Sequence, residues 1–258
     1  MRMNKSASRV VDILLLLTSK KRPITISEVS HALRIPKSSA FELLYTLVEK
    51  GFLQMADEKL KTFSTGIKLF EVGVSYLANT DLHREARPFL ERIMSESGET
   101  AFLAVEDQGE LVYLEKVEAS SSVRTTAVLG SRKPMHCTAL GKALLAAYDP
   151  QRVRSITGEG SLPSLTKYTI TTYQALLMDL AKIRQRGYAI DDKESEIEVF
   201  CVAAPVYGQA NLPIAAISIA SLASKVDDGK LEQLSGLITA AALSISRRLG
   251  FMGEKLYF

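Results

Sequence analysis

The sequence has few cysteines and no long apolar segment. Its 258 residues include two cysteines, Cys137 and Cys201, too few for the disulfide framework of a small secreted protein. No apolar run approaches the roughly 20 residues that a membrane-spanning helix needs. The first residues are basic but lack the small-residue cleavage site of a signal peptide. These absences predict a cytoplasmic protein that has no membrane partner.

The overall composition is that of a folded globular protein. The chain is 47% apolar and 24% charged, which excludes a disordered or collagen-like protein. Its length suits one large domain or two ordinary domains. The sequence contains no internal repeat and no low-complexity segment.

The formal net charge of +3 hides an uneven distribution. Residues 1–68 hold 12 Lys and Arg against 6 Asp and Glu, a balance of +6, and the remainder of the chain carries −3. A basic N-terminal segment is suited to binding a polyanion such as nucleic acid. Chance clustering of surface charges would give the same totals, so the pattern within the segment has to decide.

The basic segment contains the pattern of three helices. Residues 10–17 place apolar side chains at helical spacing. Residues 25–28, Thr-Ile-Ser-Glu, form a capping box that opens a second, short helix. A tight turn at residues 34–36 ends in a proline, which favours the start of a third helix. Gly51 is typical of the end of that helix.

A β-hairpin is predicted after the third helix. Residues 52–55 and 59–63 are typical of two strands, joined by a turn at residues 56–58. Three helices followed by a hairpin predict an all-α winged helix-turn-helix domain over residues 1–66. In such a domain the second helix of the pair lies in the major groove of DNA.

The predicted DNA-contacting residues lie on the third helix and on the hairpin. They face away from the apolar side of the helix or are cations that would meet phosphates. They are Lys37, Ser38, Ser39, Phe41, Glu42 and Tyr45 on the helix, and Lys59 and Lys61 on the hairpin. Winged helices also dock other proteins, so a protein-docking module is the alternative.

The remainder of the chain predicts a linker helix at residues 67–80 and a second domain at residues 81–258. The linker carries an apolar stripe, which suits packing on a partner or on the first domain. Strands are predicted at residues 100–105, 111–117, 123–127, 188–190, 200–206 and 214–219, and helices at residues 81–97, 139–148, 172–186 and 231–245. Runs of strands flanked by helices predict an α+β domain with an antiparallel sheet.

No arrangement of residues in the second domain is typical of catalysis. A nucleophilic cysteine needs a base within reach and a lowered pKa; His136 is adjacent to Cys137 only in sequence, and Cys201 lies in an apolar strand. The sequence contains no set of three or four Cys and His residues at the spacing of a zinc site. The glycines of residues 158–161 lack the lysine and the helix of a phosphate-binding loop. We therefore predict no catalytic residue, no metal and no cofactor.

Three segments carry a resemblance to a known family. They are LRIPKSSAFELL at residues 33–44 with GFL at 51–53, GSRKPMHCTALGKALLA at residues 130–146, and residues 186–206 from RGYA to CVAAPV. In this order and spacing they resemble the IclR family of bacterial transcriptional regulators. The resemblance covers nearly the whole chain. It implies a GAF-like second domain with a six-stranded sheet, and a linker helix that helps to form a dimer.

Two residues depart from the family pattern. Glu42 stands in the third helix where the family usually has an arginine, which removes a cation from the DNA-facing side. An acid at this position is able to accept a hydrogen bond from cytosine N4. Glu198 stands where the family favours glycine before the segment of Cys201.

A binding site for a small molecule is predicted at the start of the helix at residues 139–148. Thr138 caps this helix and leaves the N–H groups of Ala139 and Leu140 free to bind an anion, although most capped helices bind nothing. The resemblance implies an effector pocket completed by Asp191, Val199, Cys201 and Ser218. Ala220 replaces a second serine of the family, which favours an effector larger or less polar than glyoxylate.

We therefore expect a cytoplasmic transcriptional regulator that binds double-stranded DNA as a homo-oligomer, a dimer or a tetramer. The two DNA-binding domains of a dimer predict a near-palindromic operator whose half-sites lie about 10 bp, or a multiple of about 10 bp, apart. The effector is expected to be a small organic or sugar acid. Repressor and activator share this architecture. The alternative is a metabolite-binding enzyme or scaffold whose winged helix docks protein.

Overall fold

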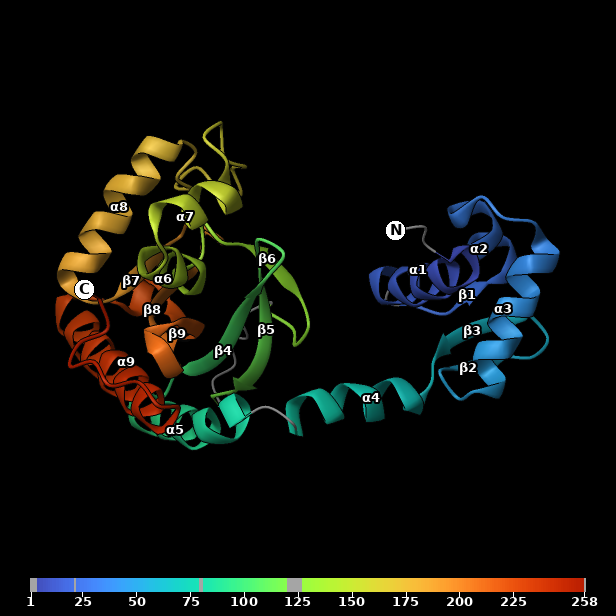
Figure 1. The fold of residues 1–258 in the computed structure, drawn as a ribbon, viewed down its shortest axis with the longest axis horizontal. Coiled ribbons are helices and arrows are strands. Elements are labelled where there is room, and N and C mark those ends of the chain that lie inside the picture. Colours follow the sequence, from blue (N-terminus) through green and yellow to red (C-terminus); the bar gives the residue numbers. More distant parts are fainter. Residues whose placement is uncertain (1–3, 21, 79–80, 120–126, 258) are drawn as a thin grey trace. The chain divides into compact units, whose positions relative to one another are not determined.

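The computed structural model describes residues 4–20, 22–78, 81–119 and 127–257 (Figure 1). The chain divides into two compact units, Met1–Thr80 and Asp81–Phe258. Within the described ranges, no helix is long and apolar enough to cross a membrane.

The first unit is a winged helix-turn-helix. Its elements are α1 (Lys5–Lys20), β1 (Ile24–Thr25), α2 (Ile26–Leu33), α3 (Lys37–Glu49), β2 (Leu53–Asp57), β3 (Thr62–Thr65) and α4 (Ile67–Ala78). The strands form an antiparallel sheet in the order β1-β3-β2. Helices α1, α2 and α3 and the sheet enclose one core, in which Ile13, Val29, Leu44 and Phe63 are fully buried.

Local sequence signals explain the helix-turn-helix. The Thr25 hydroxyl accepts a hydrogen bond from the backbone N–H of Glu28 (3.2 Å), and the Glu28 carboxylate accepts one from the N–H of Thr25 (2.8 Å). The predicted capping box at the start of α2 is therefore confirmed. At the end of α2, Arg34 takes a left-handed conformation (φ 52°), and Pro36 starts α3.

The predicted hairpin is confirmed, but the bounds of its second strand are wrong. β3 begins at Thr62, so that Lys59 and Lys61 lie in the turn and not on the strand. The reason is the Asp57 side chain, which accepts hydrogen bonds from the N–H groups of Lys59 (2.8 Å) and Leu60 (2.9 Å). This turn competes with strand pairing. Strand β1 was not predicted, because two residues carry no periodic signal.

The second unit is an α+β domain. Its helices are α5 (Asp81–Ser97), α6 (Ala139–Ala147), α7 (Pro150–Thr157), α8 (Tyr173–Arg186) and α9 (Asp228–Arg248), with 3-10 turns at Gln209–Asn211 and Ala223–Lys225. Its strands are β4 (Thr100–Asp107), β5 (Glu110–Val117), β6 (Arg132–Pro134), β7 (Ala189–Asp192), β8 (Val199–Tyr207) and β9 (Pro213–Leu222).

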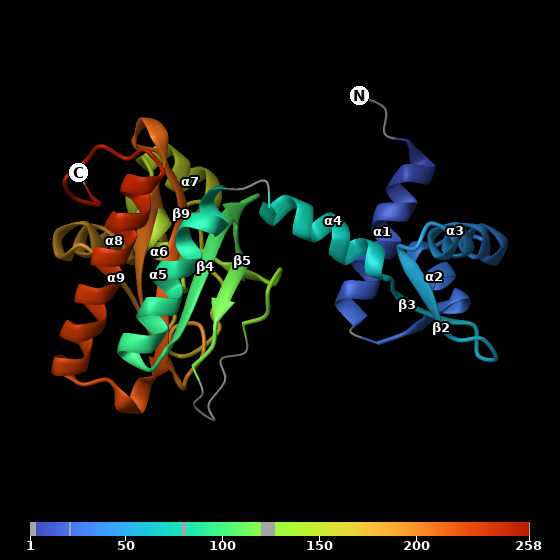
Figure 2. The same ribbon diagram turned by 90° about the horizontal axis from the view of Figure 1, so that it is seen from below.

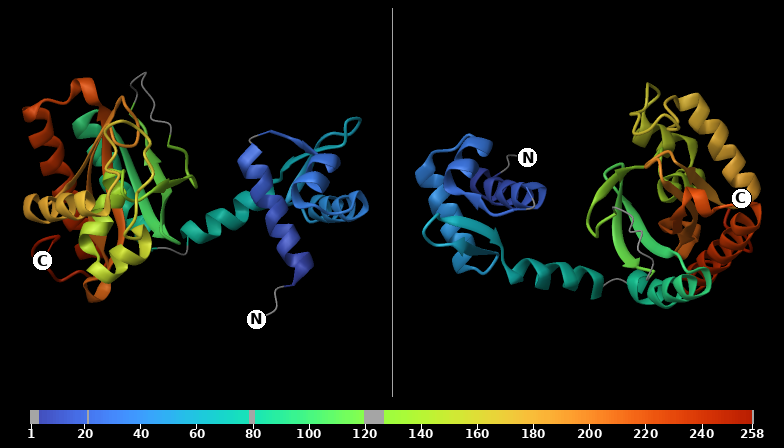
Figure 3. Two further views of the ribbon diagram at one scale, coloured as in Figure 1. Left: turned by 90° about the horizontal axis from the view of Figure 1, so that it is seen from above. Right: turned by 180° about the vertical axis from the view of Figure 1, so that it is seen from behind.

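The six strands form one antiparallel sheet in the order β6-β5-β4-β9-β8-β7. Helices α5 and α9 lie side by side in front of the sheet, and α6 lies behind it (Figure 2). Helix α8 packs on α6 and forms an outer layer on that side (Figure 3). The predicted fold class, with a helical head and an antiparallel α+β domain, is confirmed.

Two elements of the second unit were not predicted. Strand β6 has three residues and only one apolar member, so it lacks an alternating pattern. Helix α7 has the start signal Asp149-Pro150, in which the Asp149 side chain accepts a hydrogen bond from the N–H of Arg152 (2.9 Å). Of the strand predicted at residues 123–127, residues 123–126 lie outside the described residues, and Ala127 is not in a strand.

Candidate functional sites

The exposed side of α3 carries the six residues predicted there. Lys37, Ser38, Phe41 and Glu42 are exposed, and Ser39 and Tyr45 are half-buried. The opposite side of the helix is fixed in the core by Ala40, Leu44 and Leu47. Because this side is anchored, the exposed side has a defined orientation in the unit.

The two predicted hairpin lysines lie in the turn between β2 and β3, and both are exposed. Among the described residues, no hydrogen bond, ion pair or ring contact joins this turn to the exposed side of α3. Nor does Lys37, Lys59 or Lys61 take part in any ion pair within the part of the chain that the structure describes. These cations are therefore available to an external anion.

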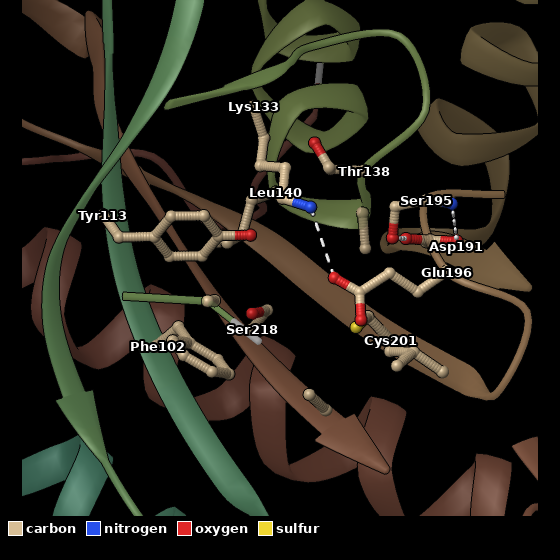
Figure 4. Close-up of a pocket in the computed structure, with 14 residues that line it drawn as sticks. Phe102, Tyr113, Lys133, Thr138, Leu140, Asp191, Ser195, Glu196, Cys201 and Ser218 are labelled. Atoms are coloured by element: carbon tan, nitrogen blue, oxygen red, sulfur yellow. Dashed lines mark hydrogen bonds and ion pairs between the residues drawn. The ribbon is translucent and has the colours of Figure 1, made fainter. Parts of the chain in front are cut away.

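The second unit has a pocket between the start of α6 and the sheet (Figure 4). The space between atoms there is about 420 Å³, part of it open to solvent, and the centre of a water molecule can occupy about 30 Å³. All seven residues predicted for the effector site line this pocket. They are Thr138, Ala139, Leu140, Asp191, Val199, Cys201 and Ser218.

Strand register explains why residues distant in sequence meet here. Asp191 on β7 is paired with Cys201 on β8, and Cys201 is paired with Ala220 on β9. Phe102 on β4 is paired with Ser218 on β9. Residues directly opposite one another in antiparallel strands share a face of the sheet. Two such rows therefore form the floor of the pocket.

The start of α6 faces the pocket with free N–H groups. The Thr138 hydroxyl accepts a hydrogen bond from the N–H of Gly141 (3.2 Å) and donates one to the carbonyl of Pro134 (3.1 Å). In the described part of the chain, the backbone N–H groups of Ala139 and Leu140 donate to no acceptor. Unbonded N–H groups and the helix dipole favour an anion at this end of a helix.

The turn before α6 approaches the helix so closely that residue 141 has no room for a side chain. A Cβ atom on Gly141 would lie 2.3 Å from the carbonyl oxygen of Met135 and 2.4 Å from its Cα. Helix α6 itself is buried on all sides, since eight of its nine residues, Ala139 to Ala146, are buried.

Asp191 is buried at the opposite side of the pocket, where it organises the loop after β7. Its carboxylate accepts hydrogen bonds from the N–H groups of Glu194 (2.8 Å) and Ser195 (3.2 Å) and from the Ser195 hydroxyl (2.5 Å). Burial raises the pKa of the Asp191 carboxyl, and the hydrogen bonds from Ser195 and Glu194 offset part of this effect. Asp191 therefore shapes the pocket wall as well as facing it.

Several further residues line the pocket that the residue patterns did not single out. They are Phe102, Tyr113, Ala127, Lys133, Ser195 and Glu196. Lys133 pairs with Glu196 (3.2 Å) across the pocket (Figure 4). Lys133 lies within the segment at residues 130–146, and Phe102 and Tyr113 lie in predicted strands. The available signal was therefore their place in those segments and not their residue type.

Tyr113 offers a hydroxyl to the pocket. Its ring meets Phe102 edge-on (5.4 Å between ring centres), and its hydroxyl is directed toward the start of α6 (Figure 4). Burial raises the pKa of Tyr113, so the hydroxyl keeps its proton at neutral pH. It has no hydrogen-bond partner among the described residues and is able to donate to a ligand.

Two family models match the chain. The IclR helix-turn-helix domain matches residues 6–56, and the bacterial transcriptional regulator IclR C-terminal domain matches residues 74–247. The chain belongs to the IclR family. Its predicted function as a DNA-binding transcriptional regulator with a C-terminal effector-binding domain is confirmed.

Relatives of this IclR regulator match it along nearly its whole length. The transcriptional regulator XynR of Escherichia coli is 32% identical over 247 residues, which cover 96% of this chain and 98% of XynR. The crystal structure of Thermotoga maritima IclR is 32% identical and superposes with a TM-score of 0.79 over 95% of this chain and 99% of that one. An IclR homologue of Microbacterium hydrocarbonoxydans, solved in complex with 4-hydroxybenzoate, is 24% identical with a TM-score of 0.83, over 95% of this chain and 99% of its own.

The thiols of this IclR regulator are poor nucleophiles. Burial raises the pKa of Cys137 to about 12 and also raises that of Cys201. His136 is buried and donates through Nε2 to the carbonyl of Pro163 (2.8 Å). Within the described residues, no three His, Cys, Asp or Glu side chains gather to hold a metal ion.

A buried ion cluster lies behind the pocket. Lys142 of α6 is 1% exposed. Its ammonium group contacts Asp179 of α8 (2.8 Å) and Glu194 of the loop after β7. The second carboxylate oxygen of Glu194, Oε2, is buried and has no hydrogen-bond partner among the residues that the structure describes. This cluster joins α6, α8 and the loop that carries Ser195 and Glu196.

Proposed function

We propose that this IclR regulator binds a near-palindromic operator as a homo-oligomer, and that a small organic or sugar acid in the pocket of the second unit controls it. The observation that carries the effector proposal is the convergence of all seven predicted residues on one pocket. We also propose that the protein is cytoplasmic and not an enzyme. Its membership of a family of bacterial transcriptional regulators supports both statements.

The DNA site in this proposal is the exposed side of α3 together with the hairpin turn. Lys37, Lys59 and Lys61 are exposed and unpaired in the described structure, and the segment at residues 1–68 carries a charge of +6. Phosphate contacts by such cations supply much of the affinity of a DNA-binding protein. Ser38, Ser39, Phe41, Glu42 and Tyr45 are the proposed base-edge and backbone contacts.

Oligomerisation is supported by apolar side chains on α4. Ile67 is 71% exposed and Phe70 is 67% exposed, and Val72 and Val74 are also exposed. Apolar side chains of this size lose contact with water when a second copy packs on them. The side chains of Tyr76 and Leu77, which belong to the predicted stripe, lie outside the described residues. A separate linker at residues 67–80 stays a prediction, as does the half-site spacing of about 10 bp.

The effector site in this proposal has complementary polar ends. The free N–H groups of Ala139 and Leu140 suit a carboxylate, and Tyr113 is able to donate to the same group. Asp191 and Glu196 are able to accept hydrogen bonds from hydroxyl groups of the ligand. The roughly 30 Å³ open to water centres holds about two to three waters at about 10–15 Å³ each. A larger ligand must therefore separate Lys133 from Glu196.

DNA binding is tested by the salt dependence of affinity for a duplex from the upstream region of the chain's own gene. Each phosphate contact contributes a slope of about −0.9 to the logarithm of affinity against the logarithm of salt. Lys37→Ala/Lys61→Ala removes two contacts from each half-site, four for a dimer on its operator, and should make the slope less steep by about 3.6. An unchanged slope would reject this docking surface. Absence of binding at about 50 mM salt would instead favour the protein-docking alternative.

The effector site is tested by thermal unfolding with a panel of small carboxylates, including sugar acids and 4-hydroxybenzoate, beside their uncharged analogues. A ligand at 100 times its Kd stabilises by about 2.7 kcal/mol, which raises the Tm of a unit of this size by roughly 5–11 °C. Tyr113→Phe should weaken ligand binding, because it removes one hydrogen-bond donor. Cys201→Ala should change the affinity for the ligand, because Cys201 is part of the floor of the pocket. If no acid shifts the Tm of any of these proteins, the proposed ligand class is wrong.

A further inference from the structure

An acidic side chain stands on the side of α3 that would face DNA. Glu42 is exposed and forms no ion pair with any of the described residues. A carboxylate close to phosphates is repelled unless it meets a hydrogen-bond donor, because a carboxylate only accepts hydrogen bonds. The amino groups of cytosine (N4) and adenine (N6) are the donors that the major groove offers.

Cytosine satisfies this carboxylate better than adenine. Adenine presents the acceptor N7 beside its amino group, and that acceptor faces a second acceptor when the side chain is a carboxylate. Cytosine presents its amino group without such a neighbour on the same base. The chemistry of Glu42 therefore favours a cytosine.

The residue next to Glu42 is Phe41, whose aromatic ring is held in place by its neighbours. Phe41 is 42% exposed, and its ring packs on that of Tyr45 at 4.2 Å between centres with an interplanar angle of 32°. The Tyr45 ring in turn meets the fully buried Phe63 edge-on at 5.7 Å. This stack supports the Phe41 ring from behind and leaves its outer part open. The C5-methyl group of thymine is the apolar group that the major groove offers to such a ring.

We propose that Glu42 and Phe41 determine base specificity, with Glu42 accepting a hydrogen bond from the N4 amino group of a cytosine and Phe41 contacting the C5-methyl group of a thymine in the same half-site. This inference rests on the proposed DNA site on α3. In this inference Glu42 and Phe41 recognise particular bases, whereas the lysines contact phosphates, which are the same in every DNA sequence.

The role of Glu42 is tested by selecting duplexes from a random library with three proteins: the wild type, Glu42→Gln and Glu49→Gln. Wild type should select a cytosine at one position of each half-site. Glutamine pairs with adenine N6 and N7, so Glu42→Gln should exchange that cytosine for adenine. The change in preference should be roughly 5- to 150-fold. Glu49 is exposed at the far end of the same helix, so Glu49→Gln should select the wild-type sequence.

The role of Phe41 is tested on the selected duplex by replacing each thymine with uracil, which removes only the methyl group. Loss of one buried methyl should lower wild-type affinity about 3- to 5-fold at one position. Phe41→Ala should bind more weakly and lose this sensitivity, so that thymine and uracil duplexes bind equally. Circular dichroism checks that the Glu42, Glu49 and Phe41 variants are folded.

Each outcome decides between defined alternatives. If wild type selects a sequence but Glu42→Gln selects the same one, and uracil duplexes bind as well as thymine duplexes, the assignment of base reading is wrong and the DNA-binding function stands. If wild type selects no sequence and binds duplexes no more tightly at low salt than at high salt, both the inference and the proposed DNA site are wrong.

Discussion

The close approach of Met135 to α6 makes Gly141→Ala a sharp test of the pocket geometry. The new Cβ would lie 2.3 Å from the carbonyl oxygen of Met135, and ordinary contact begins at about 3.4 Å. The turn and the helix must therefore separate by about 1 Å. Overpacking of this kind costs about 1–3 kcal/mol, and distortion of the Thr138 cap costs about 1 kcal/mol more. In the opposite direction, alanine stabilises a helix by about 1 kcal/mol relative to glycine.

The net expectation for Gly141→Ala is a loss of about 1–3 kcal/mol, which lowers the Tm by roughly 2–12 °C in a unit of this size. Gly236→Ala in α9 is the matched control, because nothing lies within 4 Å of its Cβ position. It should raise the Tm by roughly 1–4 °C. Differential scanning calorimetry of both variants measures the contrast. Equal or higher stability of Gly141→Ala would show that the turn is not packed against α6 as described.

Two further perturbations test the ion pairs. Lys142→Met leaves the buried Glu194 and the partly exposed Asp179 without their cation, and should destabilise the second unit by about 3–5 kcal/mol in urea unfolding; a change below about 1 kcal/mol would contradict a buried Lys142–Glu194 pair. In the first unit, hydrogen bonds from Arg22 and Thr25 lower the pKa of Glu28 from 4.5 to about 2. Because the folded-state pKa is the lower one, this contribution to stability is present above pH 4.5 and is lost as the pH falls toward 2. The pair is exposed to solvent, so its loss in Glu28→Gln should change the stability at neutral pH little but should flatten the dependence of unfolding on pH in that range.

Local signals in the sequence were enough for most of the fold. The capping box at residues 25–28 and the apolar stripes of α3 and α9 are short-range patterns that the tertiary structure keeps. Strand β6 could not be predicted, because its three residues are held by pairing with β5 rather than by their own pattern. The displaced start of β3 depends on one side chain, Asp57, which bonds the backbone of the next residues.

The pocket was predictable only in part for a related reason. The start of α6 follows from the cap residue Thr138, but Asp191, Cys201 and Ser218 were connected to it through the family resemblance. Their meeting depends on the register of β7, β8 and β9, which no local pattern contains. Tyr113 and the Lys133–Glu196 pair enter the pocket through tertiary packing. Tyrosine, lysine and glutamate are also common on protein surfaces, so their residue types alone do not indicate a pocket.

The burial of α6 on every side has a consequence for how a ligand acts. The helix that supplies the free N–H groups is enclosed by the sheet and by α8, and Lys142 ties it to Asp179. A tightly packed element shifts as a unit or not at all. The Lys133–Glu196 pair spans the pocket, and its side chains are 27% and 28% exposed. In the proposed effector site, a ligand would therefore gain room by parting the Lys133–Glu196 ion pair, while the helix that supplies the free N–H groups stays in place.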